Sequence, residues 1–480
     1  MVVRERLEEE KPKASGKRIE NIIDACLDPN LFGPWFKDMS NWVAWFAFLR
    51  TAFGLELKKE HQHIYEQCTK RSEPPKQQFD EVWLVIGRRG GKSRVLALIA
   101  VFMACFFDWT PYLTPGERAT IVIIATDRRQ ARIVLRYIRA FLEGIPMLDD
   151  MVEVYKAESF DLDGQVTIEV HTATFRGVRG YAIPCAIMDE IAFFRSENSF
   201  NPDYEIIEAV RPGMASMPKP MLICASSPHA RRGELYKTYK KYFGKNDPNV
   251  LVWQAPTRRM NPTISQKVID AAYARDAAKA SAEFGANFRT DVETYVKEES
   301  LIDCTITGRT ELPPSSDHIY SAFTDPSGGS EDSFTLGIAH QEGDKAVLDL
   351  LREMKPPFSP DDVTSDYCEI IKKYHTSHVL GDRYAGEWPR ERFRAHGVHY
   401  EVCTKAKSDI YRDLLPLLNS KTAELLDDPI LFNQALGLER RTGRGRRDTI
   451  DHAPGGHDDV INAGAGALIM VSGAGPIDIW

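Results

Sequence analysis

The sequence predicts an α/β protein with two domains, the first of them built on a mainly parallel sheet. Its 480 residues leave room for two or three domains of ordinary size. In the first half, short apolar runs of strand length alternate with helical stretches, the order of elements found in a parallel sheet covered by helices. Near residue 305 this pattern stops in a segment rich in Pro, Ser and Thr, and a second alternating series follows.

The composition is that of an ordinary globular chain, with 43% hydrophobic residues and a formal net charge of −8. Local basic patches, not the overall charge, would therefore hold a nucleic-acid partner. The eight cysteines form no C-x-x-C pair, so neither a zinc site nor a disulfide framework is indicated and we expect reduced thiols. Residues 1–20 are too charged for a signal peptide, and no apolar stretch is long enough to cross a bilayer, so we expect an intracellular protein without a membrane segment.

Helices are expected at both ends of the first domain. Apolar residues at helical spacing predict one helix over residues 40–70, which Ser40 and Asn41 are suited to cap. A second long helix is expected over residues 261–295, opened by Asn261-Pro262. Between them lie four runs rich in Val and Ile, "EVWLVIG", "RATIVIIAT", "IPCAIMDE" and "PMLICASS". They are typical of buried parallel strands, whose carboxyl ends form the ligand crevice.

The domain boundary is placed in the segment "TITGRTELPPSSD", which has no periodicity. The predicted first domain covers residues 1–305, the linker residues 306–317 and the second domain residues 318–480.

The stretch "VWLVIGRRGGKSRVLALIA" places a glycine-rich loop between a predicted strand and a predicted helix. It departs from the pattern G-x-x-x-x-G-K-[ST], because Ile86 takes the first glycine position and the glycine follows at Gly87. Backbone amides in such a loop point at phosphate, and the helix N-terminus favours an anion. Lys92 would reach the β- and γ-phosphates, and Ser93 would bind Mg²⁺. A glycine turn before a helix is the other interpretation. The expected nucleotide contacts are Gly87, Arg88, Gly90, Gly91, Lys92 and Ser93.

A second motif supports nucleotide hydrolysis. The strand "CAIMDE" ends in Asp189-Glu190, where the first acid would hold the Mg²⁺ water shell and the second would orient and deprotonate the attacking water. The two motifs, in order and on separate buried strands, predict an ATPase. At the end of the next strand, Ser226-Ser227 would either sense the γ-phosphate or form a simple turn.

Arginines near these motifs are candidates for a residue supplied to a neighbouring subunit's γ-phosphate. Arg176 and Arg179 precede the "CAIMDE" strand, and Arg88 lies inside the loop. A local salt bridge is the alternative for each. The segment "RRGELYKTYKKY" interleaves basic residues with tyrosines, which suits contact with a phosphate backbone or a solvated helix face.

Three acids in the second half end predicted elements and are expected to converge. Asp325 and Asp382 end strands, and Asp459 opens a helix together with Asp458. Asp451 lies in a hydrophilic loop upstream. Hard oxygen ligands of this kind hold Mg²⁺ or Mn²⁺, and a pair of such ions supports phosphodiester cleavage. Each acid taken singly is also an ordinary cap or turn former.

A basic β-hairpin is expected in "LGLERRTGRGRRDTIDH", between the second and third acids. It would guide a polyanion to the acids, or protect a sheet edge from aggregation. Its arginines are Arg440, Arg441, Arg444, Arg446 and Arg447.

Taken together, the motifs make the chain similar to the large terminase subunits of tailed double-stranded DNA bacteriophages. The similarity runs through "NWVAWFAFLRTAFG", "GRRGGKS", "IATDRRQAR", "RGVRGYAIPCAIMDE", "ICASSPHARRGELY" and "HDDVINA". The resemblance implies an N-terminal P-loop ATPase of the additional-strand type and a C-terminal RNase H-like nuclease domain. It also implies that an arginine inside the loop is usual in this family.

By the same resemblance, Glu190 is the catalytic base, Asp189 and Ser93 bind metal, and Arg179 acts in trans. Asp325, Asp382 and Asp459 are the nuclease ligands, with Asp458 and Asp451 as further candidates. The implied cofactors are ATP and Mg²⁺, with Mn²⁺ possible at the nuclease site.

The implied function is viral DNA packaging: ATP-driven translocation of double-stranded DNA into a procapsid and cleavage of concatemeric DNA. The implied partners are DNA, a portal protein, a small terminase subunit and further copies in a ring, expected to be a pentamer. The implied place is the host cytoplasm, not the finished virion. The alternatives are a DNA-repair helicase–nuclease, a scaffold ATPase whose C-terminal acids are structural, and a transposase or integrase.

Overall fold

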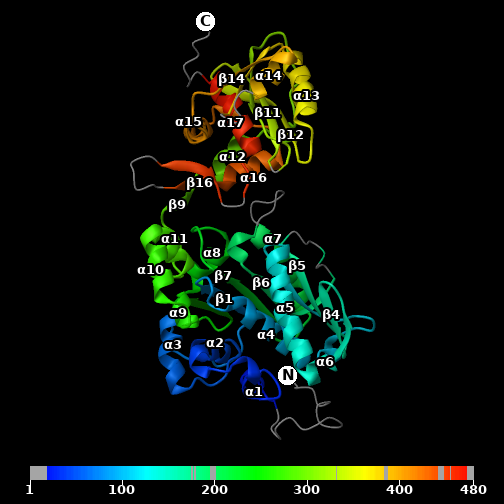
Figure 1. The fold of residues 1–480 in the computed structure, drawn as a ribbon, viewed down its shortest axis with the longest axis vertical. Helices are drawn as coiled ribbons and strands as arrows, with labels where there is room; N and C mark the ends of the chain where they lie inside the picture. Colours follow the sequence, from blue (N-terminus) through cyan, green and yellow to red (C-terminus); the bar gives the residue numbers. More distant parts are fainter. Residues whose placement is uncertain are drawn as a thin grey trace. The chain divides into compact units, whose positions relative to one another are not determined.

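The structure is a computed structural model that describes residues 19–173, 177, 180–194, 202–330, 332–382, 388–441, 448–453 and 456–472. The described chain forms two compact units, the first ending at Thr290 and the second beginning at Asp291 (Figure 1). The sequence analysis placed a linker at residues 306–317 instead. Residues 291–305 lie with the second unit because they pack there: Leu301 and Cys304 are buried in its core. In the described residues, no helix has both the length and the apolar character needed to cross a membrane.

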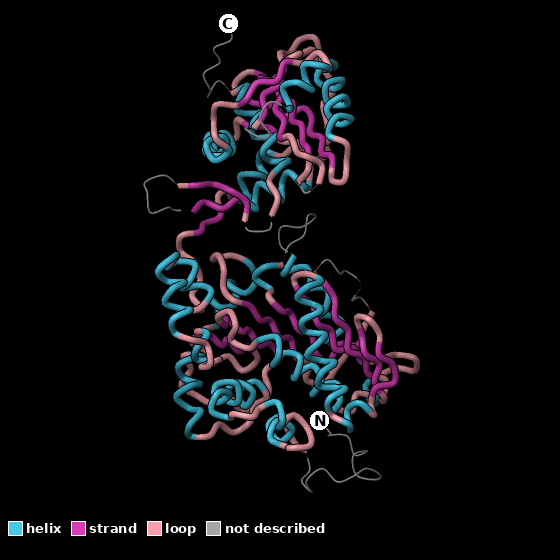
Figure 2. The backbone as a smooth tube through the Cα atoms, in the orientation of Figure 1, coloured by secondary structure: helices cyan, strands magenta, loops and turns pink. Residues whose placement is uncertain are grey.

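An eight-stranded sheet forms the centre of the first unit, with the strand order β3-β4-β5-β2-β6-β7-β1-β8. Figure 2 draws its strands in magenta. Six neighbouring strands, from β5 to β8 in this order, run parallel, whereas β3, β4 and β5 pair antiparallel. The strands are β1 Glu81–Ile86, β2 Ala119–Ala125, β3 Val152–Tyr155, β4 Ser159–Leu162, β5 Val166–Thr172, β6 Ala182–Asp189, β7 Met221–Ser226 and β8 Val250–Ala255. The four strands expected from the sequence are thus present and parallel, and β7 lies between β1 and β6.

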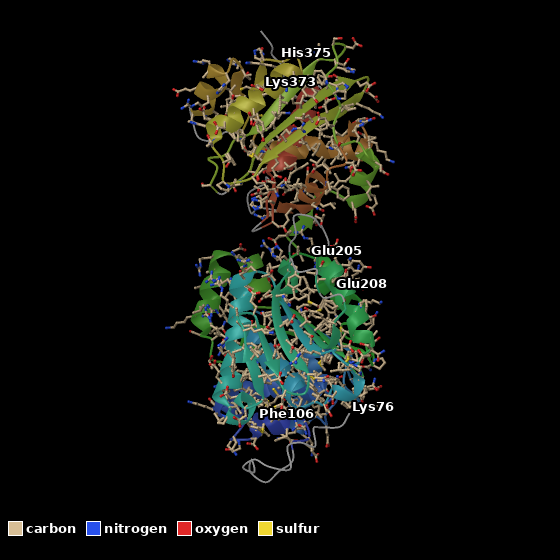
Figure 3. All side chains as sticks on the ribbon, turned by 90° about the vertical axis from the view of Figure 1, so that its right-hand side faces the viewer. Lys76, Phe106, Glu205, Glu208, Lys373 and His375 are labelled. Carbon is tan, nitrogen blue, oxygen red and sulfur yellow. The ribbon has the colours of Figure 1, made fainter. Side chains whose placement is uncertain are left out.

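Helices cover both faces of this sheet. Side chains of β1 alternate, so that Leu84 packs in one core with helix α4 and Val85 in another with α7 and α8. The outer face of α7 is charged, with exposed Glu205 and Glu208 (Figure 3). The helices are α1 Ile22–Leu27, α2 Val43–Ala52, α3 Lys59–Thr69, α4 Lys92–Cys105, α5 Arg128–Gly144, α6 Pro146–Asp149, α7 Pro202–Ala215, α8 Gly233–Tyr242, α9 Thr257–Met260, α10 Gln266–Arg275 and α11 Ala277–Glu283.

Both long helices expected from the sequence are interrupted. The stretch 40–70 divides into α2 and α3, because Gly54 between them has a left-handed φ of 65° and lies against the backbone of Gln77. At the start of the stretch 40–70, the capping hydrogen bond is accepted by Asp38 and not by Ser40 or Asn41. The stretch 261–295 divides into α10, α11 and strand β9, Val292–Thr294, because Asp276 ends one helix and caps the next.

The second unit contains a six-stranded mixed sheet with the order β14-β13-β10-β11-β12-β15. Strands β10, β11 and β12 pair antiparallel, and β13 and β14 extend the sheet parallel to β10, which is the RNase H-like arrangement expected. A separate three-stranded sheet joins β9, β16 and β17, so the predicted hairpin is present. The strands are β10 Tyr320–Asp325, β11 Phe334–Glu342, β12 Lys345–Met354, β13 His378–Gly381, β14 His399–Val402, β15 Ala423–Glu424, β16 Leu438–Arg441 and β17 Thr449–His452.

Helix α17 lies very close to the six-stranded sheet, because glycines on both elements leave room for the other. A Cβ on Gly337 of β11 would be 2.5 Å from the carbonyl oxygen of Ala463, and one on Gly466 would be 2.3 Å from the ring of Phe323. Helices α13 and α14 contribute Tyr367 and Phe393 to a second core that β10 and β11 share. The helices of this unit are α12 Glu298–Cys304, α13 Pro360–Lys373, α14 Trp388–Ala395, α15 Lys407–Ser420, α16 Pro429–Gly437 and α17 Asp459–Val471. Exposed Lys373 marks the end of α13 (Figure 3).

All eight cysteines of the chain are free thiols with buried side chains. This agrees with the reduced state expected from their spacing.

Candidate functional sites

The first candidate site lies where the parallel strands β1, β6 and β7 end. Register pairs Val85 with Ser226 and Asp189 with Ala225, so the residues that follow these strands share one edge of the sheet. The loop between β1 and α4 begins at the same edge. The structure therefore brings together the two predicted motifs and the serine pair.

Lys92 lies at the centre of this cluster. Its ammonium is 3.2 Å from Oε1 of Glu190, donates to Oγ of Ser227 at 3.1 Å and to the carbonyl oxygen of Ile86 at 3.2 Å. The side chain is only 5% exposed. The carboxylate and carbonyl oxygens around this buried ammonium stabilise it.

Asp189 is fully buried beside the start of α4. Its Oδ2 accepts from Oγ of Ser93 at 2.9 Å, while Oδ1 is buried and accepts no hydrogen bond. Burial, reinforced by the nearby Glu190 carboxylate, raises the pKa of Asp189 to about 7. A buried carboxylate oxygen without a partner is the arrangement that a cation would satisfy.

Glu190 has a left-handed φ of 59°, which is uncommon for a non-glycine residue. This turn directs its carboxylate back to the ends of β1 and β7. There Oε2 accepts from Oγ of Ser226 at 3.0 Å and from the amide of Ser227 at 3.1 Å. Ser226 and Ser227 thus contact Glu190, and Ser227 also contacts Lys92. Their position at a strand end did not by itself predict these contacts.

Of the arginines considered for a role in trans, only Arg88 can be described. Its side chain is 65% exposed and lies 3.4 Å from Oε1 of Glu283. Arg176 and Arg179 lie outside the described residues. The assignment of a trans-acting arginine stays a prediction.

The sequence of α8 suggested a surface on which basic residues and tyrosines alternate, and the structure differs from this. Tyr236 and Tyr239 do not alternate with the lysines on one surface, since both rings pack against Phe288. Lys237 pairs with Glu234 at 2.8 Å on the outside of the helix.

A further basic surface lies on α5, whose first residues were quoted above only as part of the similar stretch "IATDRRQAR". Exposed arginines line its first three turns, with Asp127 as the N-cap. Positive side chains at a helix N-terminus are unfavourable, because the helix dipole is also positive there. An anionic partner would relieve this repulsion, so the surface favours one. These residues are Arg128, Arg129, Arg132 and Arg136.

The second candidate site lies at the end of β10. Thr324 pairs with Gly381 across parallel strands, so Asp325 and Asp382 follow at one edge of the sheet. Asp325 pairs with Thr335 of β11, whose hydroxyl donates to the carbonyl oxygen of Asp459 at 2.8 Å. Strand pairing and this hydrogen bond therefore place the backbones of three acids far apart in sequence at neighbouring element ends, while a metal site shared by their side chains stays a prediction.

The carboxylates of this cluster influence one another. Oδ2 of Asp325 accepts from Nδ2 of Asn462 at 2.7 Å. Burial raises the pKa of Asp325 to about 7 despite that hydrogen bond, with smaller contributions from the charges of Asp459 and Asp382. Burial, followed by the charge of Asp458, raises the pKa of Asp459 to about 6. Oδ2 of Asp459 is buried and accepts no hydrogen bond.

Both carboxylate oxygens of Asp458 already have partners in the structure, and its assignment as a metal ligand stays a prediction. Lys407 contacts Oδ1 at 3.0 Å and Oδ2 at 2.9 Å, and the hydroxyl of Tyr411 donates to Oδ2 at 2.9 Å. Asp451 lies on strand β17 and not in a loop, 3.5 Å from the same ammonium. Ligand atoms of Asp451, His452 and Asp458 lie within 4.8 Å of one another, but Lys407 supplies the positive charge there.

The basic hairpin is described only at its base. Arg440 contacts Asp448, and Arg441 donates to the carbonyl oxygen of His452 at 2.8 Å. Arg444, Arg446 and Arg447 lie outside the described residues.

The sequence did not predict several residues that are distant in the chain but contact one of the two clusters directly. Lys407, Tyr411 and Asn462 support the second site, and Trp45 and Thr257 contact the glycine-rich loop. Only Asn462, three residues beyond Asp459 on the same helix, carried a local signal: i and i+3 share a helix face.

The fold and the first cluster define a P-loop protein of the additional-strand type, since β7 lies between the loop strand β1 and the acid-bearing strand β6. Residues 43–286, more than half of the chain, match the family described as "Uncharacterized protein MJ0330, N-terminal P-loop domain". The chain belongs to this family. No curated protein matches the chain.

The chain is similar in structure to large terminases of bacteriophages. The HK97 enzyme is 18% identical, with 81% of this chain and 91% of that chain covered and a TM-score of 0.38. The large terminase of a thermophilic bacteriophage in complex with ATP-γ-S is 12% identical, with 82% and 94% covered and a TM-score of 0.37. The large terminase nuclease of another thermophilic phage, G20c, with bound magnesium is 16% identical, with 35% and 94% covered and a TM-score of 0.32. All three scores lie below 0.5, and no functional assignment rests on them.

Proposed function

We propose that this chain is a viral DNA-packaging large terminase subunit that hydrolyses ATP in its first unit and cleaves DNA in its second. The observation that carries the proposal is the presence of two separate buried acid clusters, one in each unit, next to a phosphate-binding loop and at an RNase H-like strand end respectively. The motifs quoted from the sequence, in their order, support the terminase assignment.

In the first unit, Lys92 would bind the β- and γ-phosphates, and Glu190 would orient and deprotonate the attacking water. Ser93 and Asp189 would hold Mg²⁺, and the unpartnered Oδ1 of Asp189 fits this role. When bound, the ion neutralises charge on the triphosphate. Glu190 is paired with Lys92 in the structure, so phosphate binding to the ammonium would release the carboxylate for its work as a base.

In the second unit, Asp325, Asp382 and Asp459 would hold Mg²⁺ or Mn²⁺. Oδ2 of Asp459, which accepts no hydrogen bond and lies 3.9 Å from Nδ1 of His457, fits a cation better than the oxygens of Asp458, which Lys407 and Tyr411 already contact. When bound, such ions lower the pKa of water and stabilise the leaving oxygen of a phosphodiester. Asn462 would hold the Asp325 carboxylate in position.

Double-stranded DNA is the proposed substrate, and the exposed arginines of α5 and the hairpin would contact its phosphates. The further partners proposed are a portal protein, a small terminase subunit and other copies of this chain in a ring, in the host cytoplasm. In such a ring Arg179 or Arg88 would act on the neighbouring site.

The decisive experiment measures ATP turnover and plasmid digestion on two variants. Glu190→Gln should lower DNA-stimulated ATP turnover by about 10²–10⁴-fold and leave Mn²⁺-dependent digestion intact, because the base belongs to one site only. Asp382→Asn should abolish digestion and leave ATP turnover. Glu208→Gln and Asp366→Asn, which change exposed acids on α7 and α13, are the matched controls.

Loss of both activities from either change would contradict two independent sites. A scaffold ATPase would show no metal-dependent digestion to lose. A repair helicase–nuclease would unwind duplexes, which a strand-displacement assay detects, and a transposase or integrase would not need Glu190.

A further inference from the structure

The outer side of the glycine-rich loop is held by side chains from distant parts of the first unit. Three successive backbone carbonyl oxygens of the loop each accept a hydrogen bond. Oγ1 of Thr257 donates to Arg88 at 2.8 Å, Nδ2 of Asn261 to Arg89 at 2.9 Å, and Nε1 of Trp45 to Gly90 at 2.9 Å. We call Trp45, Thr257 and Asn261 the loop brace.

The brace comes from two separate segments of the chain. Trp45 lies on α2 and is 1% exposed, while Thr257 begins α9 and is fully buried. Asn261 ends α9. The loop also fits closely against two of these residues: a Cβ on Gly87 would be 2.4 Å from Oγ1 of Thr257, and one on Gly91 would be 3.2 Å from Nε1 of Trp45.

The loop needs this support because its backbone is strained. Arg89 has a φ of 64° and Gly91 a φ of 97°, and a left-handed conformation costs a non-glycine residue about 1 kcal/mol or more. Alternation of right- and left-handed residues makes successive amides converge in an anion-binding concavity. Because the carbonyls of residues 88–90 are bonded on the outside, they are held away from the anion.

We propose that Trp45, Thr257 and Asn261 are positioning residues that preorganise the loop for the triphosphate of ATP. The brace takes the place of the glycine missing at Ile86 by fixing the loop from outside. The brace acts through the loop backbone, and its effect appears as tighter nucleotide binding. The inference rests on the proposed ATPase function.

Trp45→Phe removes one indole hydrogen bond and keeps an aromatic ring in the core. The matched control is Trp109→Phe, because Trp109 is likewise buried and its Nε1 donates to the carbonyl oxygen of Met103 at 2.9 Å, away from the loop. Binding of MgATP-γ-S to the full chain is measured by calorimetry, and folding by thermal unfolding. Loss of one neutral hydrogen bond predicts about fivefold weaker binding for Trp45→Phe and unchanged binding for Trp109→Phe.

Asn261→Asp gives a second test that does not disturb the core, because Asn261 is half-buried. The new carboxylate keeps the acceptor for the amide and hydroxyl of Thr263 and replaces only the donor to Arg89. We expect roughly tenfold weaker binding or more, because two oxygens then face each other. Thr263→Val, which removes the hydroxyl contact alone, should bind as wild type.

Equal affinities for Trp45→Phe, Asn261→Asp and wild type would overturn the brace while leaving the ATPase proposal intact. Equal weakening in Trp45→Phe and Trp109→Phe would overturn it as well, since a general loss of core stability would then suffice. A wild-type chain that binds no MgATP-γ-S would refute the proposed function and the brace together.

Discussion

Replacing Gly466 by Ala should push α17 away from the six-stranded sheet of the second unit. The added Cβ would lie 2.3 Å from Cγ of Phe323 and 2.5 Å from both Cδ atoms, about 0.9–1.1 Å short of an ordinary 3.4 Å contact. Three ring atoms are approached at once, so rotating the ring gives little relief and the helix must move outward. Overpacking costs about 1–3 kcal/mol, against about 1 kcal/mol gained in helix propensity.

The movement would disturb the second site more than it disturbs stability. Asp459 and Asn462 lie on the same helix, and Phe323 is two residues from Asp325 on β10. A misplacement of about 1 Å can lower a rate by about 10²-fold. We therefore expect Mn²⁺-dependent digestion to fall by about this factor, with unfolding of the second unit about 0–8 °C lower and ATP turnover unchanged.

Gly464→Ala on the same helix is the matched control. Its Cβ would meet only the flexible ends of leucines, at 3.3–3.6 Å. This variant should keep wild-type digestion and gain up to about 1 kcal/mol of stability from helix propensity. If Gly466→Ala proved as stable and as active as Gly464→Ala, the close approach of α17 to β10 would not be the constraint described here.

Two further predictions concern buried charges. Lys407→Met should leave the buried Asp458 carboxylate without its cation, and the loss should lie near the lower end of the roughly 3–5 kcal/mol lost when a buried ion pair is broken, because the Lys407 side chain is itself 30% exposed. Adding Asp458→Asn to Lys407→Met should restore most of the lost free energy of unfolding. If denaturant titrations showed that the losses of the two single variants add, the pairing of Lys407 with Asp458 would be contradicted. Burial raises the pKa of Asp203, so its contribution to stability is complete below the unfolded pKa near 4 and is lost as the pH rises toward the folded pKa. The cost of Asp203→Asn, measured by urea unfolding, should therefore shrink as the pH rises above the unfolded pKa; a constant cost would contradict this.

The sequence was informative where one short stretch determines the outcome. Continuous Val and Ile runs predicted β1, β2, β6 and β7, because a strand buried on both faces needs no alternation. Since parallel strands end at a common edge, the acids at those ends predicted the two clusters.

The remaining features depend on contacts between distant residues. Lys407 and Asp458 are 51 positions apart and Trp45 and Gly90 are 45 apart, so no periodicity links them. The helix breaks at Gly54 and Asp276 were missed because apolar spacing continued across them, and only a left-handed φ or a capping carboxylate marks the interruption.

The burial of all eight cysteines makes the chain well suited to site-specific fluorescent labelling. Burial also raises the thiol pKa at several of them, Cys68 to about 12 among them, so little reactive thiolate forms at neutral pH. A cysteine introduced at an exposed position on each unit would therefore react with a maleimide dye ahead of the native thiols. Energy transfer between two such dyes would measure the separation of the two labelled positions during turnover, without first removing any native cysteine.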